Sequence, residues 1–510
     1  MADSNVSLLP LLGHTSLDAI VAWRGVGTTA GRRRGPVTVR EFLADSRRVA
    51  RGLAAFDGGA PAAGPRRFVL NGCADHYHFC VGLAAALLNG QISILPHNHV
   101  RQTLADLADD YPGVFALIDD GEPPAILASV RYAELDRDVA TDAPPDEAPG
   151  DSVDDAAADA APNANANPDP IPAFPADTPV AVLFTSGSTG KPVALPRDWG
   201  TIVASALGAA ARLDMTPQQP WSVLATVPAQ HSYGFESAIW LPLQTGGIVA
   251  ARRPFYPADV FDSLAELPSP RLLVTSPVHL RATLASPTPV PRVDRVLSAT
   301  APLPIELAHS AEHLFGGTML EIYGSTETGQ VALRQPLASD VWQTLPGVRF
   351  TQRDDQTIAA GGHVPEPRAL NDRIELIDAE HFRLLGRLSD LVNVGGRRGS
   401  VTFIERQLQA IEGVLDAAVL DAEDDRARPD TRARLTGFVV APGLTARQIE
   451  AAMRQRVDAV FVPRPLYHVD RLPRDGNGKL PRQRLVELAR QLGQAAAERR
   501  QRPRRGTDNG

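Results

Sequence analysis

Two hydrophobic patterns alternate along the first part of the chain. The segment 38–56 carries large apolar side chains at helical spacing, which predicts an amphipathic helix. The residues that make this pattern are Phe42, Val49, Leu53 and Phe56. The next segments predict a buried strand, a second helix and another strand, at 66–72, 75–90 and 91–96. Strands that alternate with helices are typical of a parallel α/β sheet.

The alternation resumes at residue 177 and continues to about residue 385. Four apolar runs in this part end in loops of small and polar residues, and each predicts a strand: AVLFTSG, WSVLATVP, RLLVTSP and DRVLSATAP. After Arg387 the pattern changes to that of a compact α+β unit. The elements expected there are helices at 401–411 and 446–457 and strands at 415–424 and 436–443.

A polar stretch interrupts the alternation between residues 138 and 170. It is made of Ala, Asp, Pro and Asn with almost no large apolar side chain, so burial cannot repay the entropy of ordering it. We interpret it as a mobile surface insertion that ends near residue 176; an acidic docking segment is the alternative. The expected domains are 1–386, 387–492 and a frayed basic tail at 493–510, for which contact with a polyanion is the alternative.

Composition narrows the class of protein. The chain has 510 residues, 44% of them hydrophobic, which suits a globular protein of at least two domains. The formal net charge of -8 gives no electrostatic reason to expect a nucleic-acid partner. Cys73 and Cys80 have no metal or redox spacing, so we expect reduced, buried thiols.

The sequence shows no signal for export or membrane insertion. The N-terminus lacks the basic head and cleavage site of a signal peptide. The longest apolar run, at 81–88, is much shorter than the ~20 residues that span a membrane. We therefore expect a cytoplasmic protein without a membrane span.

The stretch TSGSTGKPV, residues 185–193, is a candidate phosphate-binding loop. A P-loop of the Walker type requires four residues between its glycines and a hydroxyl residue after its lysine. Here two residues separate Gly187 from Gly190, and Pro192 follows Lys191. Proline offers neither a backbone N–H to a phosphate nor a hydroxyl to a metal. The loop is therefore no Walker motif.

A glycine-rich loop that follows a strand still favours anions, because its backbone N–H groups and hydroxyls can close on phosphate oxygens. A plain surface turn is the alternative, since Ser, Thr and Gly dominate turns. The residues expected to bind phosphate are Thr185, Ser186, Gly187, Ser188, Thr189, Gly190 and Lys191.

Three further motifs follow this loop in a fixed order. They are EIYGSTETG at 321–329, GRLSDLVNVGGRR at 386–398 and LPRDGNGKLPR at 472–482. With the glycine-rich loop they resemble the adenylate-forming superfamily, which includes acyl- and aryl-CoA synthetases, peptide-synthetase adenylation domains and luciferases. The resemblance covers about residues 37–488.

The resemblance implies a fold and a reaction. The fold is a large N-terminal α/β domain and a small mobile α+β domain that rotates about Ser389 and then exposes the loop 392–398. In the first step a carboxylate attacks the α-phosphate of Mg²⁺-bound ATP, releasing pyrophosphate and leaving an acyl- or aryl-adenylate. In the second, a thiol displaces AMP; it belongs to coenzyme A or to the phosphopantetheine arm of an acyl carrier protein. Cations and oriented donors must offset the repulsion between the reacting anions.

The resemblance also assigns roles to single residues. Tyr323 matches the aromatic residue that packs on adenine, and Asp372 and Arg387 match the pair that binds the ribose hydroxyls. Thr326 matches the hydroxyl that contacts the α-phosphate, and Glu327 matches the Mg²⁺ ligand. Two further matches are Lys479, for the mobile lysine that bridges carboxylate and phosphate, and His231, for a residue near the substrate carboxylate.

Each of these residues also has an ordinary structural interpretation. Lys479 lies in a glycine turn, where lysines are usually solvated. Asp372 and Arg387 are compatible with a surface ion pair, and Tyr323 with simple packing. His231 is compatible with a buried histidine whose hydrogen bonds are satisfied.

The chain departs from the family pattern at several positions. Val193 and Ala194 stand where a lysine and a glycine usually follow the loop, although Arg197 is near. Leu370 and Asn371 replace the usual Thr-Gly before Asp372. Only 45 positions separate Glu327 from Asp372, which predicts a trimmed third subdomain.

Two other hypotheses remain at this point. Val193 and the short 328–371 interval favour a non-catalytic adenylate-binding paralogue that acts as a scaffold. A P-loop NTPase is the other, and Pro192 argues against it.

Overall fold

The structure is a computed structural model that describes most of the chain. Residues 186–191 of the glycine-rich loop, Lys479 and most of the expected insertion lie outside its described residues. The described residues are 7–25, 34–56, 67–96, 98–135, 170–185, 192–286, 290–354, 356–387, 391–394, 397–421, 435–457, 459–475 and 480–501.

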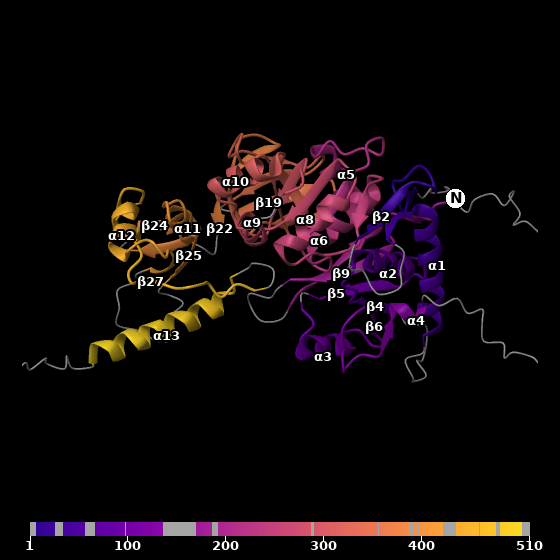
Figure 1. Ribbon diagram of the computed structural model, residues 1–510, viewed down its shortest axis with the longest axis horizontal. Helices are drawn as coiled ribbons and strands as arrows, with labels where there is room; N and C mark the ends of the chain where they lie inside the picture. The colour runs from indigo at the N-terminus through magenta and orange to yellow at the C-terminus, as the bar shows by residue number, and fades with distance from the viewer. Residues whose placement is uncertain are drawn as a thin grey trace, which may run out of the picture.

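The larger of two main sheets forms the centre of the molecule (Figure 1). Among the described residues it has eleven strands, in the order β21-β22-β17-β16-β15-β14-β13-β11-β12-β2-β3. The neighbours from β15 to β2 pair in parallel, and the pairs at both edges are antiparallel. The strands are β2 (Ile20–Arg24), β3 (Gly35–Thr38), β11 (Ser222–Ala225), β12 (Ile248–Ala250), β13 (Arg271–Thr275), β14 (Arg295–Ser298), β15 (Thr318–Ser325), β16 (Gly329–Arg334), β17 (Trp342–Thr344), β21 (Asp372–Leu376) and β22 (His381–Arg387).

The second main sheet has six described strands, in the order β10-β9-β5-β4-β6-β7. All of its pairs are parallel except β9 with β10. The parallel α/β architecture predicted from the hydrophobic patterns is therefore confirmed. The strands are β4 (Phe68–Asn71), β5 (Ile92–Leu95), β6 (Phe115–Ile118), β7 (Ser129–Arg131), β9 (Pro179–Phe184) and β10 (Ala194–Asp198).

The two helices predicted in the first part of the chain, α1 and α2, are present and start within one residue of the expected positions. Thr38 and Glu41 form a capping box at the start of α1, and Asp75 accepts hydrogen bonds from the first turn of α2. The helices are α1 (Val39–Ala55), α2 (His76–Leu88), α3 (Arg101–Asp110), α4 (Tyr132–Leu135), α5 (Trp199–Arg212), α6 (Ser232–Gly234), a π-helical turn (Phe235–Trp240), α7 (Leu241–Gln244), α8 (Pro257–Glu266), α9 (Pro277–Leu284) and α10 (Ile305–Phe315).

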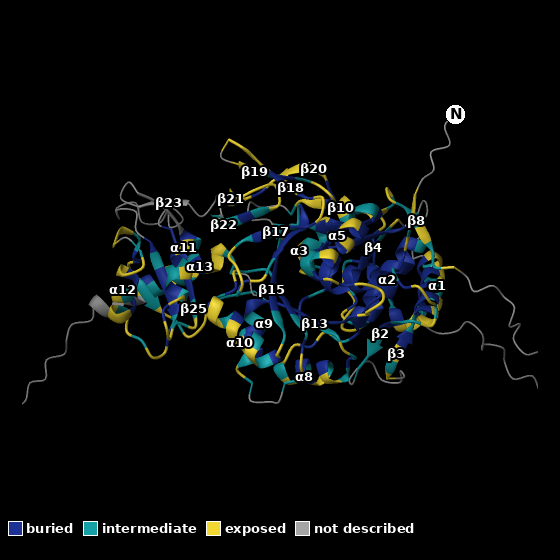
Figure 2. Ribbon diagram, turned by 90° about the horizontal axis from the view of Figure 1, so that it is seen from above, coloured by how far each residue is buried: buried dark blue, intermediate teal, exposed yellow. Residues whose placement is uncertain are grey.

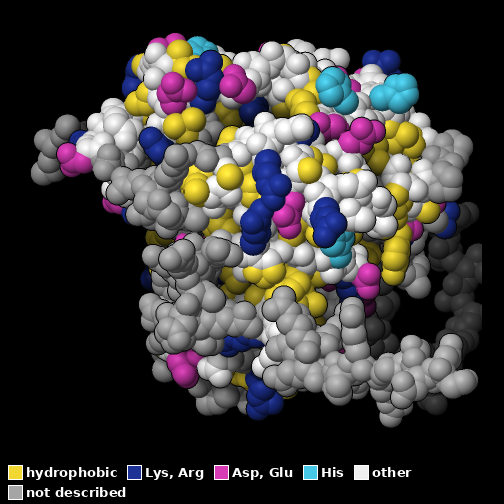
Figure 3. Space-filling model, turned by 90° about the vertical axis from the view of Figure 1, so that its left-hand side faces the viewer, with side chains coloured by type: hydrophobic (Ala, Val, Ile, Leu, Met, Phe, Trp, Pro, Cys, Tyr) yellow, Lys and Arg dark blue, Asp and Glu magenta, His cyan; other side chains and the backbone are white. Residues whose placement is uncertain are grey.

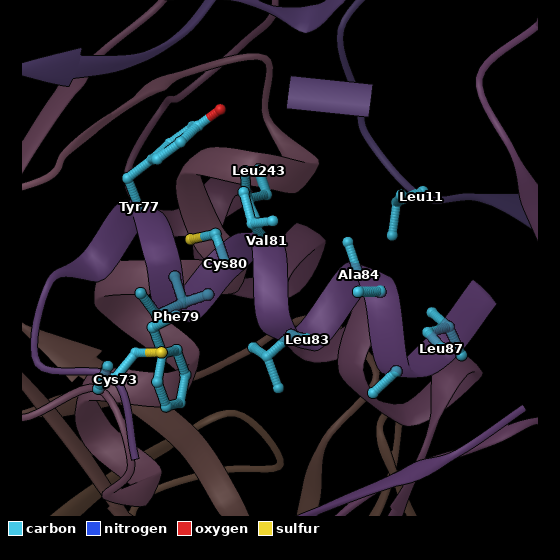
Figure 4. Close-up of a cluster of buried hydrophobic side chains, with 14 of the residues drawn as sticks. Leu11, Cys73, Tyr77, Phe79, Cys80, Val81, Leu83, Ala84, Leu87 and Leu243 are labelled. Carbon is cyan, nitrogen blue, oxygen red and sulfur yellow. The ribbon is translucent and has the colours of Figure 1, made fainter. Parts of the chain in front are cut away.

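Helix α2 is buried on all sides, as its almost continuous apolar sequence requires. Figure 4 shows its side chains between Leu243 and Leu11 on one side and Cys73 on the other. Cys73 and Cys80 are free and buried, which confirms the expected state of both thiols. Burial raises the pKa of each thiol, so neither is a ready nucleophile.

The expected insertion is shorter than predicted at its C-terminal end. Residues 173–175 form β8 (Ala173–Pro175), which pairs antiparallel with β1 (Leu8–Pro10). Ile171 and Phe174 pack against the main core, and these two apolar side chains explain why the segment is ordered. Residues 136–169 lie outside the described residues.

The interval 328–371 contains β16, β17 and a small antiparallel sheet. This sheet runs β18-β19-β20 and lies over the outside of the molecule, where much of it is exposed (Figure 2). Its strands are β18 (Arg349–Arg353), β19 (Gln356–Gly361) and β20 (Val364–Ala369).

The C-terminal elements form a smaller unit at one end of the molecule (Figure 1). Two hydrophobic clusters belong to these elements alone. Because 388–390 lie outside the described residues, the domain boundary at 387 stays a prediction. The elements are β23 (Leu391–Val394), β24 (Arg397–Ser400), α11 (Val401–Gln409), β25 (Asp416–Leu420), β26 (Thr436–Val440), α12 (Ala446–Arg454), a 3-10 turn (Ala459–Phe461), β27 (Leu466–His468) and α13 (Arg482–Gln501).

Positive, negative and hydrophobic side chains are interspersed over the described surface that faces the viewer in Figure 3. Helix α13 continues to Gln501, into the segment predicted to be a frayed tail, because Ala, Glu, Gln and Arg are strong helix formers. Within the described part of the chain, no helix is long and apolar enough to cross a membrane.

Candidate active site

The motif EIYGSTETG forms a β-hairpin at the carboxyl end of β15. Strand β15 pairs antiparallel with β16, and Ser325 faces Gly329 across a turn that presents Thr326 and Glu327. Hydrogen bonds between Ser325 and Thr328 hold the turn, at 3.2 Å from Ser325 N–H to Thr328 Oγ1. Both side chains that the resemblance assigns to phosphate and Mg²⁺ are therefore half-buried at one hairpin tip.

Steric constraints explain why two positions of this motif are glycines. A Cβ on Gly324 would lie 2.1 Å from the carbonyl oxygen of Gly329. Gly329 has φ of +70°, and a Cβ there would lie 2.9 Å from Oε2 of Glu236. Only glycine fits these two positions without displacing backbone or a buried carboxylate.

The carboxyl ends of four parallel strands, β11, β13, β14 and β15, meet at the same edge of the large sheet. Thr226 follows β11 and contacts Thr275, at the end of β13, through their hydroxyls at 2.9 Å. Thr300 follows β14 with a left-handed φ of +77°. Ligands of open α/β sheets bind outside the carboxyl ends of the strands, which places the candidate site here.

His231 reaches this edge through the loop after β11. It is half-buried and directly precedes α6. Tyr233, two residues on, donates a hydrogen bond to the carbonyl of Leu297 in β14 at 2.7 Å and fixes the helix on the sheet. A Cβ on Gly234 would lie 2.0 Å from the carbonyl oxygen of Pro228, which explains the glycine in QHSYG.

Tyr323, in the interior strand β15, is in contact with Asp372, the first residue of the edge strand β21. The Tyr323 hydroxyl donates a hydrogen bond to Oδ2 of Asp372 at 2.7 Å. The Tyr323 ring contacts Trp342 and Phe382 edge-on, with centroids 5.8 and 6.0 Å apart. Asp372 pairs in register with Arg387, whose side chain lies outside the described residues. The structure thus brings the positions assigned to adenine and ribose together.

The glycine-rich loop joins two antiparallel strands. Thr185 and Val193 close its base: the Val193 N–H donates to Thr185 Oγ1 at 3.0 Å, and the Thr185 N–H donates to the Val193 carbonyl at 3.1 Å. A Walker loop instead leads from a strand into a helix. The strand β10 after the loop therefore argues against a P-loop NTPase, as Pro192 does.

Arg197 is the cation that β10 brings to the hairpin tip. Its Nη2 donates a hydrogen bond to the carbonyl oxygen of Thr326. Burial lowers the pKa of Arg197, and the neighbouring carboxylates of Glu236 and Glu327 counteract this effect. A guanidinium held in this way offers positive charge beside the residue assigned to the α-phosphate.

Glu236 is a functional candidate that sequence reasoning missed. It lies on the π-helical turn Phe235–Trp240 and is 8% exposed. Its carboxylate accepts hydrogen bonds from Ser205 Oγ at 2.9 Å, Ser232 Oγ at 2.7 Å and the Gln330 N–H at 2.9 Å. The available signal was an acidic residue inside an apolar helix, and π-helical turns often mark functional sites.

His363 is a second missed candidate. It lies between β19 and β20 and is 4% exposed. Its Nε2 is buried without a hydrogen-bond partner among the described residues, and burial lowers its pKa. Sequence reasoning missed it because its neighbours, Thr328 and Gln330, are far from it along the chain.

The donor set at the hairpin tip suits a Mg²⁺ ion that is bound jointly by one carboxylate and by substrate phosphates. Glu327 offers one half-buried carboxylate, and among the described residues no cluster of three or more His, Cys, Asp or Glu side chains forms a metal cage. Mg²⁺ is commonly held by one or two carboxylates together with substrate phosphates. Glu327 fits that mode, whereas a dedicated protein site is absent from the described part.

The described geometry covers part of the predicted site. It brings Tyr323, Thr326 and Glu327 onto one hairpin, with Asp372 beside it and Arg197 as an added cation. It does not locate Ser186 to Lys191 or Lys479, which lie outside the described residues.

Comparison with known sequences assigns this chain to a family. The sequence profile of AMP-binding enzymes matches residues 24–381. The 4-coumarate–CoA ligase of Rhodobacter capsulatus is 30% identical over 56% of this chain and 69% of its own length. The 2-succinylbenzoate–CoA ligase of Bacillus velezensis is 25% identical over 81% of this chain and 85% of its own length.

Solved structures extend the likeness to almost the whole chain. The O-succinylbenzoate coenzyme A synthetase (MenE) of Bacillus subtilis, in complex with AMP, aligns with a TM-score of 0.72 at 20% identity. The match covers 94% of this chain and 98% of that one. ATP-bound MatB from Rhodopseudomonas palustris aligns with a TM-score of 0.69 at 20% identity, over 94% of this chain and 97% of that one. At these identities the likeness establishes the fold, a large α/β part with a smaller C-terminal part, as predicted.

Proposed function

The chain belongs to the family of AMP-binding enzymes and is an acid–thiol ligase, and from this premise we propose that it activates a small carboxylic acid with Mg²⁺ and ATP. The product of the first step is an acyl- or aryl-adenylate, and pyrophosphate leaves. In the second step the sulfur of a thiol attacks the acyl carbon and AMP leaves. The observation that carries this proposal is the hairpin that presents Thr326 and Glu327 beside Arg197, next to the Tyr323–Asp372 pair.

The Tyr323–Asp372 pair is proposed to hold the nucleoside. The ring of Tyr323 packs against adenine, Asp372 accepts hydrogen bonds from the ribose hydroxyls, and Arg387 donates hydrogen bonds to them. The hydrogen bond from Tyr323 to Asp372 supports this role, because it orients a carboxylate oxygen and leaves the other one for the ribose.

The hairpin tip is proposed to hold the reacting phosphate and carboxylate. Thr326 donates its hydroxyl to the α-phosphate, and Glu327 binds the Mg²⁺ ion. The bound Mg²⁺ would neutralise negative charge on the phosphates. His231 lies near the substrate carboxylate, and the loop from Thr185 to Lys191 closes on the outer phosphates.

Lys479 is proposed to bridge the carboxylate and the α-phosphate in the first step. Lys191 and Lys479 are the only lysines in a chain in which Lys and Arg together number 51. Lysine is a compact point charge, whereas arginine is a planar fork, so the two are not interchangeable at a crowded reacting centre. Because lysine occurs at these two motif positions and nowhere else in the chain, a specific role is supported for each of the two residues.

The thiol is proposed to be coenzyme A, since the relatives named above are CoA ligases. A carrier-protein phosphopantetheine arm is the second candidate acceptor. The scaffold hypothesis is supported only by the departures at Val193 and in the 328–371 interval. Localisation in the cytoplasm stays part of the proposal.

The test is carboxylate-dependent exchange of pyrophosphate into ATP across a panel of aromatic and aliphatic acids, with full-length protein. We expect exchange with at least one acid, and thioester formation when coenzyme A is added. A parallel reaction with a holo acyl carrier protein identifies the acceptor. Intact AMP binding without exchange for any acid in the panel would favour the scaffold instead.

A further inference from the structure

The hairpin tip is held at both of its ends by charged side chains from other segments. At the start of the tip, Arg197 donates one hydrogen bond to the carbonyl of Thr326 and another, at 3.1 Å, to the carbonyl of Pro196. At the end of the tip, Oε2 of Glu236 accepts a hydrogen bond from the Gln330 N–H at 2.9 Å. The opposite charges of Arg197 and Glu236 also stabilise each other. The tip is therefore fixed between strand β10 and the π-helical turn.

The carboxylate of Glu236 is in turn fixed by the residues around it. Ser205 Oγ donates a hydrogen bond to Oε2 at 2.9 Å, and Ser232 Oγ donates one to Oε1 at 2.7 Å. The side chain of Gln330 adds a second link to the same π-helical turn, because its Nε2 donates to Ser237 Oγ at 2.7 Å. A buried charge that loses a donor is costly, so the carboxylate has one favourable position. Through Gln330 that position is passed on to the hairpin.

The space between Glu236, Gly329 and His363 is too small for any part of a substrate. It measures about 10 Å³, which is enough for one water molecule at most. The His363 ring hydrogen-bonds to the backbone at Thr328 and Gln330, which adds a third support to the tip. These side chains therefore act on the hairpin and not on a bound molecule.

The placement of Glu327 depends on this support. Glu327 supplies a single half-buried carboxylate, and Mg²⁺ requires near-ideal octahedral geometry, so a displaced tip binds the ion poorly. Given the acid activation proposed above, we propose that Glu236 and Arg197 are positioning residues that hold the tip where Glu327 meets Mg²⁺. The same contacts hold Thr326 for the α-phosphate. Each of the two residues acts through the backbone of the hairpin.

Calorimetry measures this role without catalysis. ATP is titrated into the full-length protein once with saturating Mg²⁺ and once with EDTA, and the ratio of the two dissociation constants is the Mg²⁺ gain. We expect Glu236→Gln to lower this gain by about 10-fold, since residues that orient a metal ligand contribute roughly 10–100-fold to metal affinity. The affinity for AMP in EDTA should stay unchanged, because the Tyr323–Asp372 pair is not touched. A merely structural role of Glu236 would instead lower the unfolding temperature and leave the Mg²⁺ gain intact, which would overturn the proposal.

A second variant keeps the charge and removes only the geometry. Arg197→Lys retains the positive charge but loses the planar fork that joins the carbonyls of Pro196 and Thr326, so it should show a similar loss of the Mg²⁺ gain. The matched controls are Glu122→Gln and Arg353→Lys, at exposed positions, which should keep the full gain. Thermal unfolding shows which variants remain folded, and one folded test variant is sufficient. A full gain in the folded test variants, or no gain in the native chain, would overturn the assignment.

Pyrophosphate exchange on the same proteins separates this inference from the proposed function. Exchange by the native chain together with a full Mg²⁺ gain in Glu236→Gln and Arg197→Lys would support the ligase and contradict the roles of these two residues. A lost gain in both variants of a chain that exchanges with no acid would support the two residues and contradict the ligase.

Discussion

The hydroxyl of Tyr323 and the carboxylate of Asp372 are joined by a hydrogen bond of 2.7 Å that links β15 to β21, 49 positions apart in sequence. The bond connects the residue proposed to pack on adenine with the residue proposed to bind ribose. Loss of either partner should therefore disturb nucleotide binding more than it disturbs the chemical step.

The first prediction concerns this pair. In Tyr323→Phe the ring remains and the hydrogen bond to Asp372 is lost; bonds to charged groups contribute about 1.5–3 kcal/mol. We expect the KM for ATP in pyrophosphate exchange to rise roughly ten-fold, with kcat changed much less. Tyr256→Phe, at an exposed tyrosine, is the control. A normal KM for ATP in Tyr323→Phe would show that Asp372 needs no such support.

The second prediction concerns the two lysines. Lys479→Arg keeps the charge but replaces a compact ammonium with a planar fork, so exchange should fall by roughly 100-fold or more if Lys479 bridges the reacting groups. The matched control is the reverse change at an exposed position, Arg353→Lys on β18, which should leave exchange unaltered.

Amine-selective acetylation followed by peptide mapping provides a second measurement on the same residues. Apart from the N-terminus, only Lys191 and Lys479 can react, so loss of activity can be assigned to one of two sites. We expect ATP to protect both. Full activity after complete acetylation of Lys479 would refute its role.

The third prediction concerns Gly329. Gly329→Ala places a Cβ 2.9 Å from Oε2 of Glu236 on a backbone with φ of +70°. Residues in such conformations cost about 1–3 kcal/mol, so the free energy of unfolding should fall by at least that amount in urea denaturation. Gly443→Ala, where the new Cβ meets nothing within 4 Å, should be nearly neutral. Equal effects of the two substitutions would contradict the assigned geometry.

The fourth prediction concerns pH. Burial, together with the nearby positive charge of Arg253, lowers the pKa of His76 to about 3, although a backbone hydrogen bond at Ala250 and the carboxylate of Asp119 oppose this shift. Between pH ~6.5 and ~3 the unfolded state therefore binds a proton that the folded state does not, so stability falls as the pH falls through this window.

His76→Gln removes this proton. Its free energy of unfolding should depend less steeply on pH between ~6.5 and ~3 than that of the native chain, even if it is lower at neutral pH. His309→Gln, at an exposed histidine on α10, should keep the native slope. A native slope in His76→Gln would show that other groups cause the acid sensitivity.

Local pattern was sufficient for most elements. The helix predicted at 38–56 is α1, with Thr38 and Glu41 as its capping box, and the strands and helices expected from 66 to 96 and from 401 to 457 are present. Each of these depends on neighbours within a few positions, which a sequence window contains. The order of motifs was likewise sufficient for the family.

The surroundings of Glu236 and His363 could not be predicted in the same way. Glu236 gave only an unusual charge in an apolar helix, and His363 gave no signal. The two side chains lie close together because a π-helical turn, the hairpin after β15 and the turn between β19 and β20 come together in space.

By itself the sequence determined the family, the acid-activating chemistry it implies and the residues proposed for ATP, because these are carried by short motifs of specific residue types. Only the tertiary structure decided that Glu236 and His363 lie beside Gly329, and that Tyr323 donates a hydrogen bond to Asp372. The reason is physical: hydrogen bonds and cavities depend on contacts between segments many positions apart, and no local pattern encodes which of those segments will be neighbours.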